Sequence, residues 1–167
     1  MKSQIAHNIK HRKIADNDFY TPGKLVKELI KLVPIEKSDI ICDNAYGQGV
    51  FFNNFPPVYI KQSCDKKKDF LKWHIKQSWF ITNPPYSFLD KWLEQSCKYA
   101  IKGFAYLFGI HNLTPRRIEM CENKGFYITH IHFCKVFKWF GISSFIIWQK
   151  LDKKPKVKLT YDRVVWR

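Results

Sequence analysis

Short apolar runs alternate with amphipathic stretches along most of the chain. The apolar runs predict buried strands at 39–43, 79–81 and 103–109, further strands at 58–63, 126–133 and 142–149, and an edge strand at 157–166. Apolar residues spaced three and four positions apart predict helices at 22–33, 88–101 and 115–125, and a short helical segment at 50–52. Strands that alternate with helices in this way predict an α/β fold, a three-layer arrangement around a mainly parallel sheet.

Threonine and proline mark the start of two predicted helices. In Thr21-Pro22 and Thr114-Pro115 the threonine side chain can cap the helix and the proline can occupy its first position. Ser87 is the predicted cap of the helix at 88–101. The inward faces of the first and second long helices are predicted to carry Leu25, Val26, Leu29, Ile30 and Val33, and Leu89, Trp92, Leu93, Ser96 and Cys97.

The strand at 79–81 leads into a rigid turn, Asn83-Pro84-Pro85-Tyr86. Two prolines cannot continue a strand ladder, so the chain leaves the sheet at Asn83, at the carboxyl edge where open α/β sheets bind ligands. The Asn83 side-chain oxygen and the Pro84 carbonyl can accept both hydrogens of an amino group, and Tyr86 offers a ring for stacking on a planar base. For this tetrapeptide alone, a structural turn with a surface tyrosine is an equal alternative.

A glycine-bearing turn, Asp43 to Gly49, follows the first predicted strand. Gly47 and Gly49 allow positive φ and a close approach of the backbone to a ligand, and Asp43 can accept a hydrogen bond from a ligand ammonium. The turn is not GxGxxG and is not followed by Lys-Ser/Thr, which disfavours a dinucleotide or phosphate loop. A tight turn without a ligand fits these residues as well.

Two acids follow the second predicted strand. Asp65 lies roughly 20 residues beyond the glycine turn, where an acid can bind ribose hydroxyls. Asp69 and Phe70 offer an acceptor for an adenine amino group and a ring for its face. The alternatives are an exposed acid among lysines for Asp65, and a helix-start acid with a core phenylalanine for the pair.

The order of these motifs resembles the S-adenosylmethionine-dependent amino-methyltransferases, particularly the DNA adenine N6-methyltransferases. The resemblance covers residues 19–101 and runs through Phe19-Tyr20-Thr21-Pro22, the glycine turn, Asp65, Asp69-Phe70 and Asn83-Pro84-Pro85-Tyr86. It implies a Rossmann-like class I methyltransferase fold, S-adenosylmethionine as cofactor, and methyl transfer to adenine N6 in DNA without a metal. Asn44 departs from the proline that many relatives carry.

The resemblance also implies roles for single residues. Cofactor binding falls to Tyr20, Thr21, Asp43, Ala45, Gly47, Gly49, Asp65, Asp69 and Phe70. The catalytic residues are Asn83 and Pro84, which hold the target amine, and Tyr86, which stacks on a base flipped out of the duplex or already unpaired. Contacts to the base or nucleic acid are expected from Trp139, Phe140, Lys138 and Arg116. Core packing fits the aromatics equally, and a solvated face is the favoured alternative for Arg116.

Composition and charge favour a globular domain with a polyanionic partner. Hydrophobic residues make up 46% of the chain and charged residues 26%, and the formal net charge is +15. That excess predicts nucleic acid as the partner without distinguishing DNA, which the resemblance implies, from RNA, and lysine-rich coding bias is the alternative. The length of 167 residues predicts one domain, with a basic arm at 1–18, a basic tail at 152–167 and no separate target-recognition domain. Sequence selectivity would then be weak, or a partner or a second copy would supply it.

Three sequence features that are missing restrict the class of protein further. No apolar run approaches the roughly 20 residues that span a bilayer, and Met1 to Gln4 lack the apolar segment of a signal peptide. Five cysteines suit free thiols in a reducing compartment, so a cytoplasmic location is expected. A metal site at His130, His132 and Cys134, with Cys121, is disfavoured because CxxC and HxxxH spacings are missing.

Two rival functions remain compatible with the sequence. The turn at 83–86 also serves enzymes that methylate RNA adenine or a protein glutamine amide, but a glutamine enzyme usually has an extra helical domain upstream, and 18 residues precede Phe19 here. A catalytically silent relative that binds nucleic acid is the second rival, and the presence of both Asn83 and the glycine turn argues against it.

Overall fold

The computed structural model describes residues 21–64, 69–137, 139 and 141–167. Its strands are β1 (Ile40–Asp43), β2 (Ile60–Ser63), β3 (Gln77–Thr82), β4 (Ala100–Gly109), β5 (Phe126–Val136), β6 (Ser143–Lys150) and β7 (Lys158–Trp166). The α-helices are α2 (Gly23–Lys31), α3 (Val50–Asn54), α4 (Leu89–Tyr99) and α5 (Pro115–Glu122). The described residues also form three short 3₁₀ helices: η1 (Phe70–Lys72), η2 (Tyr86–Phe88) and η3 (Ile110–Asn112).

The strands form a single sheet in the order β2-β1-β3-β4-β6-β5-β7. The pairs β1–β2, β1–β3, β3–β4 and β5–β7 are parallel. β6 runs antiparallel to both of its neighbours, β4 and β5, so the sheet is mixed, which the expectation of a mainly parallel sheet did not specify. The reason is the connection 137–142, which is too short for a parallel crossover and reverses the chain directly.

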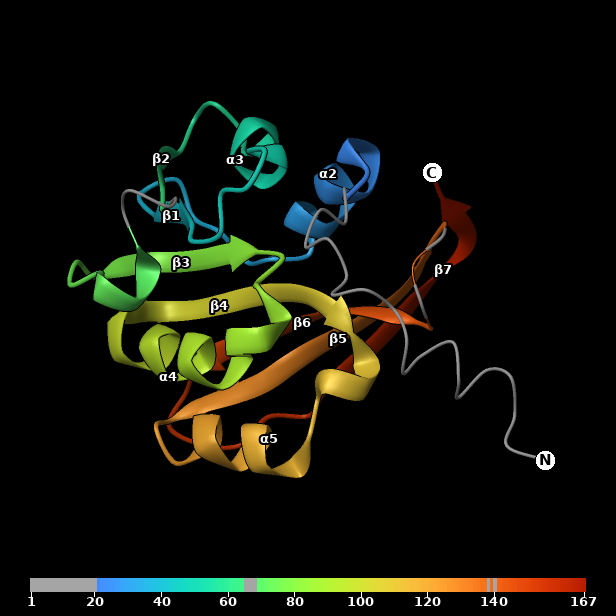
Figure 1. Ribbon diagram of the computed structural model, residues 1–167. Coiled ribbons are helices and arrows are strands. Elements are labelled where there is room, and N and C mark those ends of the chain that lie inside the picture. The colour runs from blue at the N-terminus through green and yellow to red at the C-terminus, as the bar shows by residue number, and fades with distance from the viewer. Residues whose placement is uncertain (1–20, 65–68, 138, 140) are drawn as a thin grey trace.

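Helices cover both faces of the sheet, as the sequence predicted (Figure 1). α2 and α3 enclose one core cluster, and η1, α4 and α5 enclose the other. β3 shows how one strand serves both layers, because Trp79 and Ile81 enter the first cluster and Phe80 enters the second. All six residues of β3 are buried, which fixes the point where the chain leaves the sheet at Asn83.

The helix starts agree with the sequence only in part. The Thr114 side chain caps α5 and accepts from the Arg117 N–H, as predicted. For α2, however, the N-cap is Pro22, and the Thr21 hydroxyl contacts Asn83 instead. Ser87 does not cap α4 either, because η2 comes first and α4 begins after Phe88.

The remaining predictions hold with small shifts in the element bounds. The predicted inward faces of α2 and α4 are buried except for Cys97, which is half-buried. β7 forms the edge of the sheet beside β5, as expected for 157–166. In the described part of the chain, no helix is long and apolar enough to span a membrane.

Candidate functional site

The two main sequence motifs meet at the carboxyl edge of the sheet, where β1 and β3 end side by side. The Thr82 hydroxyl donates to Asp43 Oδ1 at 2.7 Å. This bond joins the last residues of the two strands, 39 positions apart, and thereby places the glycine turn beside Asn83. The sequence singled out both motifs but not Thr82, whose signal was its place directly before Asn83.

The Asp43 carboxylate holds the glycine turn in place through hydrogen bonds. It is 1% exposed, and besides Thr82 it accepts from the N–H groups of Ala45 at 3.3 Å and Phe52 at 3.1 Å. Burial raises the pKa of Asp43 to about 6, against the lowering effect of these three hydrogen bonds. One buried acid thus holds the turn, the start of α3 and the end of β3 in a fixed relation.

The glycines give the turn a backbone shape that other residues rarely adopt. Gly47 has φ of 52° and Gly49 has φ of 73°. The Tyr46 ring lies over Gly49, where an added Cβ would stand 2.6 Å from the ring. The Tyr46 N–H donates to the Cys64 carbonyl at 2.9 Å, which ties the turn to the end of β2.

The Asn83-Pro84-Pro85-Tyr86 turn is held in place by a hydrogen bond to Thr21 and by the packing of its own residues. We call this turn the corner. Asn83 Nδ2 donates to Thr21 Oγ1 at 3.4 Å, so the carboxamide oxygen is the group that remains to accept. Pro84 is buried, and Tyr86 is half-buried against the second core cluster. Burial, with a smaller contribution from Cys134, raises the pKa of Tyr86 to about 12, which keeps the phenol neutral at physiological pH.

A buried hydrogen-bond network links the glycine turn to β4 and α4. Asn44 Nδ2 donates to the Tyr106 hydroxyl at 2.7 Å, and that hydroxyl lies 2.5 Å from Ser96 Oγ on α4. Ser96 Oγ in turn donates to the Trp92 carbonyl at 2.6 Å. Asn44, the departure from proline noted in the sequence, is therefore a structural link between the turn and β4.

Asp69 and Phe70 agree with the alternative interpretation, a helix-start acid and a core phenylalanine. Asp69 Oδ1 accepts from the Leu71 N–H at 2.9 Å and caps η1. The Phe70 ring packs on Phe80 and Trp92, with centroids 5.0 and 4.8 Å away. With 1% of its surface exposed, Phe70 has no open face for an adenine ring, so we assign it to the core and leave Asp69 as the candidate ligand contact.

The residues expected to contact the base or nucleic acid differ in their burial. Trp139 is half-buried against the first core cluster, and its carbonyl accepts from Lys135 Nζ at 2.7 Å. Arg116 is exposed at the start of α5, in agreement with a solvated face. Tyr20, Asp65, Lys138 and Phe140 lie outside the described residues.

The histidines of β5 form hydrogen bonds across to β7. His130 and His132 both contact Thr160 Oγ1, at 2.6 and 2.8 Å. Cys134 lies in the first core cluster and Cys121 in the second, so the sheet separates them. Among residues 21–64, 69–137, 139 and 141–167, no three metal-ligating side chains come close enough to share an ion.

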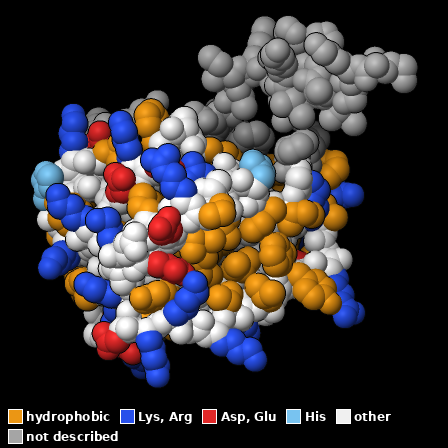
Figure 2. Space-filling view, turned by 90° about the horizontal axis from the view of Figure 1, so that it is seen from below, with side chains coloured by type: hydrophobic (Ala, Val, Ile, Leu, Met, Phe, Trp, Pro, Cys, Tyr) orange, Lys and Arg blue, Asp and Glu red, His pale blue; other side chains and the backbone are white. Residues whose placement is uncertain are grey.

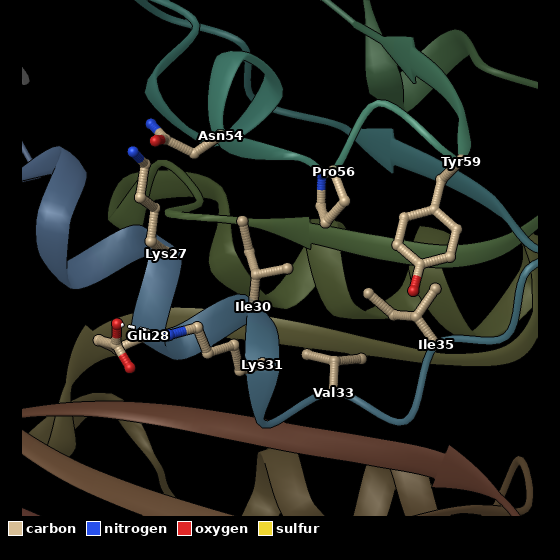
Figure 3. Close-up of a pocket in the computed structure, with 9 residues that line it drawn as sticks. All are labelled: Lys27, Glu28, Ile30, Lys31, Val33, Ile35, Asn54, Pro56 and Tyr59. Carbon is tan, nitrogen blue, oxygen red and sulfur yellow. Dashed lines mark hydrogen bonds and ion pairs between the residues drawn. The ribbon is translucent and has the colours of Figure 1, made fainter.

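A surface pocket between α2 and the segment before β2 lies away from this site (Figure 3). It has a volume of about 480 Å³ and an apolar floor formed by Ile30, Val33, Ile35 and Tyr59. A second hollow of about 800 Å³ lies between η1 and α4, near Asp69. The first pocket adjoins the amino ends of β1 and β2, so it is not part of the edge where Asp43 and Asn83 meet.

No protein-family model matches the sequence, and no curated protein resembles it closely enough to match. Solved structures do match in shape. A modification subunit of a putative type I restriction enzyme from Vibrio vulnificus YJ016 aligns with a TM-score of 0.68 at 11% identity, over 96% of this chain and 50% of that one. A putative RNA methyltransferase from Pyrococcus horikoshii aligns with a TM-score of 0.61 at 17% identity, over 78% and 85% of the two chains.

A third match is magnesium protoporphyrin IX methyltransferase from Synechocystis PCC 6803 with bound SAM, at a TM-score of 0.58 and 11% identity, over 77% of each chain. Together with the mixed α/β sheet, these likenesses show that the chain has the class I methyltransferase fold. It spans about half the length of the restriction-modification subunit.

Proposed function

We propose that this chain is an S-adenosylmethionine-dependent methyltransferase that methylates the N6 amine of adenine in DNA. The observation that carries the proposal is the hydrogen bond from Thr82 to Asp43, which sets the corner at Asn83 and Pro84 beside the glycine turn. The class I methyltransferase fold supports it, and one neighbour with this fold was solved with bound SAM. The neighbour from Vibrio vulnificus, a restriction-enzyme modification subunit, favours DNA.

The residues at the glycine turn suit the amino-acid end of S-adenosylmethionine. Gly47 and Gly49 let the backbone approach a ligand closely, and the Asp43 carboxylate adds negative charge beneath the turn. Thr21 lies on the other side of Asn83, and Asp69 is available for the adenine amine. Asp65 is proposed for the ribose by its sequence position. When bound, the cofactor supplies an electrophilic methyl group on a sulfonium.

Asn83 and Pro84 would act on the nucleophile. The Asn83 carboxamide oxygen and the Pro84 carbonyl accept the two N–H groups of the adenine amine, which draws the nitrogen lone pair out of the ring and towards the methyl carbon. As the N–C bond forms and the C–S bond breaks, positive charge appears on nitrogen, and the two oxygens stabilise it until a proton leaves to solvent. Tyr86, neutral at physiological pH, stacks on the base.

Methyl transfer from tritiated S-adenosylmethionine to defined oligonucleotides tests the proposal directly. We expect label on adenine N6 in DNA. The Pyrococcus horikoshii neighbour makes RNA the second candidate, so matched RNA oligonucleotides and bulk protein belong in the same assay. Label only on RNA or protein would replace DNA as the substrate, and failure to detect cofactor binding by calorimetry would indicate a silent relative.

Gly49→Ala should weaken cofactor binding by about tenfold or more, because alanine at positive φ costs roughly 1–2 kcal/mol and its Cβ meets the Tyr46 ring. Calorimetry with S-adenosylmethionine measures the change. Gly125→Ala is the matched control, since Gly125 also has a positive φ, 79°, but lies before β5 at the amino edge of the sheet. Equal effects of the two variants on cofactor affinity would contradict the assignment of the turn.

DNA affinity should fall steeply as salt rises, because each phosphate that a lysine or arginine neutralises releases counterion. With a net charge of +15, we expect a slope of log affinity against log salt equivalent to several phosphates, at about −0.9 per phosphate. Fluorescence anisotropy between low and physiological salt gives the slope. A flat profile would show that the positive charge does not serve a polyanionic substrate.

A further inference from the structure

A buried polar cluster fixes β7 to β5 on one face of the sheet. The Thr160 hydroxyl lies between His130 Nε2 and His132 Nδ1, and His132 Nε2 lies 3.2 Å from Asp162 Oδ1. Trp166 Nε1 donates to the other Asp162 oxygen at 2.6 Å. Because these contacts occupy one face of β7, they determine which side chains the strand presents on the opposite face.

That opposite face is apolar and exposed. Leu159 and Tyr161 are both 65% exposed and Val165 is 52% exposed. Leu159 lies beside Ile131 and Tyr161 beside Phe133 in the register of β5 and β7, so these side chains share a face. We call Ile131, Phe133, Leu159, Tyr161 and Val165 the β5–β7 patch.

The patch lies on the side of the sheet that α4 and α5 cover elsewhere, since Ile131 packs against the core cluster of those helices. Figure 2 shows hydrophobic side chains gathered on this side of the molecule, where β5, β6 and β7 lie in Figure 1. In the part of the chain that the structure describes, the helical layer therefore ends before the sheet does.

β7 is also the less protected of the two sheet edges. β2, at the other edge, has four residues, whereas β7 has nine and contains no proline. Natural proteins usually shorten, charge or cover such an edge, because its unpaired N–H and C=O groups pair readily with another strand. In the described part of the chain, β7 combines a long edge with an apolar face.

We propose that a second copy of this chain covers the patch, with β7 pairing antiparallel to its counterpart about a two-fold axis. An axis perpendicular to the sheet keeps the same face of both copies on the same side. This arrangement closes at two copies, whereas pairing β7 with the short β2 of another copy would continue into a filament. The two patches then join into one apolar face across the axis.

The area is adequate for such a dimer. The exposed parts of the patch amount to roughly 500 Å² of apolar surface per copy, against about 800 Å² that a standard interface buries on each partner. The paired backbones of the two β7 strands and the polar side chains around the patch bury the remaining area. Each copy carries a net charge of +15, so long-range repulsion opposes the association. Dimerisation should therefore strengthen with salt, which is the reverse of DNA binding.

Sedimentation velocity on nuclease-treated full chain, over a range of concentrations and at low and high salt, tests the proposal. We expect a species of twice the 20.0 kDa chain mass that becomes more abundant at high salt. Leu159→Glu and Tyr161→Glu should each weaken dimerisation about tenfold or more, as loss of a central interface contact does. Both sites are exposed, so the variants should fold, and circular dichroism checks this.

Val58→Glu is the control, because Val58 is 66% exposed but precedes β2 at the other edge. It should leave the dimer unchanged. A chain that stays monomeric at every concentration and salt would overturn the proposal and leave the patch to a different partner. A dimer that tolerates both patch variants, or that Val58→Glu disrupts equally, would overturn it as well.

Discussion

Replacing Asn83 with alanine should abolish methyl transfer while the protein stays folded. The substitution removes the side-chain acceptor for the target amine, and loss of one such preorganised group costs about 10²–10³-fold in rate. The fold should persist because the Asn83 side chain is half-buried and, among the described residues, makes one hydrogen bond, of 3.4 Å, to Thr21. A bond of that kind contributes at most about 1 kcal/mol to stability.

The measurement is incorporation of tritiated methyl into DNA, with denaturant unfolding to establish that stability is retained. Asn53→Ala is the matched control, since Asn53 is an exposed asparagine on α3. It should keep full activity. Cofactor affinity should change little in Asn83→Ala, because the residue acts on the amine rather than on the amino-acid end of the cofactor. Activity near the unsubstituted level would remove Asn83 from the reaction and with it the proposed role of the corner.

Periodicity located the strands and helices because most of them are either buried on both faces or amphipathic. β3 is buried throughout and α2 presents one clean apolar face, so both were predictable. The antiparallel direction of β6 was not, because direction depends on the short 137–142 connection rather than on the residues of the strand. Thr21 was misassigned as a cap since its hydroxyl has a competing partner, Asn83, that is 62 positions away.

The site shows the same division between local and distant contacts. Asp43, the two glycines and Asn83 could be singled out because each ends a strand or relaxes a turn. Thr82 and Tyr106 were not singled out, since their importance comes from pairing with Asp43 and Asn44 across the sheet. Phe70 followed its motif in sequence but packs into the core, where hydrophobic burial outweighs any ligand contact.

Asp43→Ala should destabilise the fold by roughly 3 kcal/mol or more, because it leaves the buried Thr82 hydroxyl and two partly buried N–H groups without their acceptor. The turn should loosen at the same time, so cofactor binding should be lost even where the variant is folded. Chemical denaturation and calorimetry measure the two effects. Asp152→Ala, which removes an exposed acid, is the control and should change neither.

The ionisation of Asp43 should also make the stability of the folded protein depend on pH. Its pKa is about 6 in the folded protein against 3.8 for the unperturbed group, so folding favours the protonated acid. Below pH 3.8 both states are protonated and Asp43 makes no pH-dependent contribution. As pH rises to about 6 the unfolded state gains from ionising and the folded state does not, so stability falls across this window by about 3 kcal/mol.

Asp43→Asn cannot ionise, so its stability should lack this fall, whatever its level at a single pH. Unfolding by denaturant at several values from pH 4 to pH 7 gives the two slopes, and their difference isolates Asp43 from the other acids. Ionised Asp43 also favours a cationic ligand, so the affinity of the unsubstituted protein for S-adenosylmethionine should decrease as pH falls below about 6. Parallel slopes for the two proteins would show that the Asp43 carboxylate is not held in the buried setting from which its role at the turn is argued.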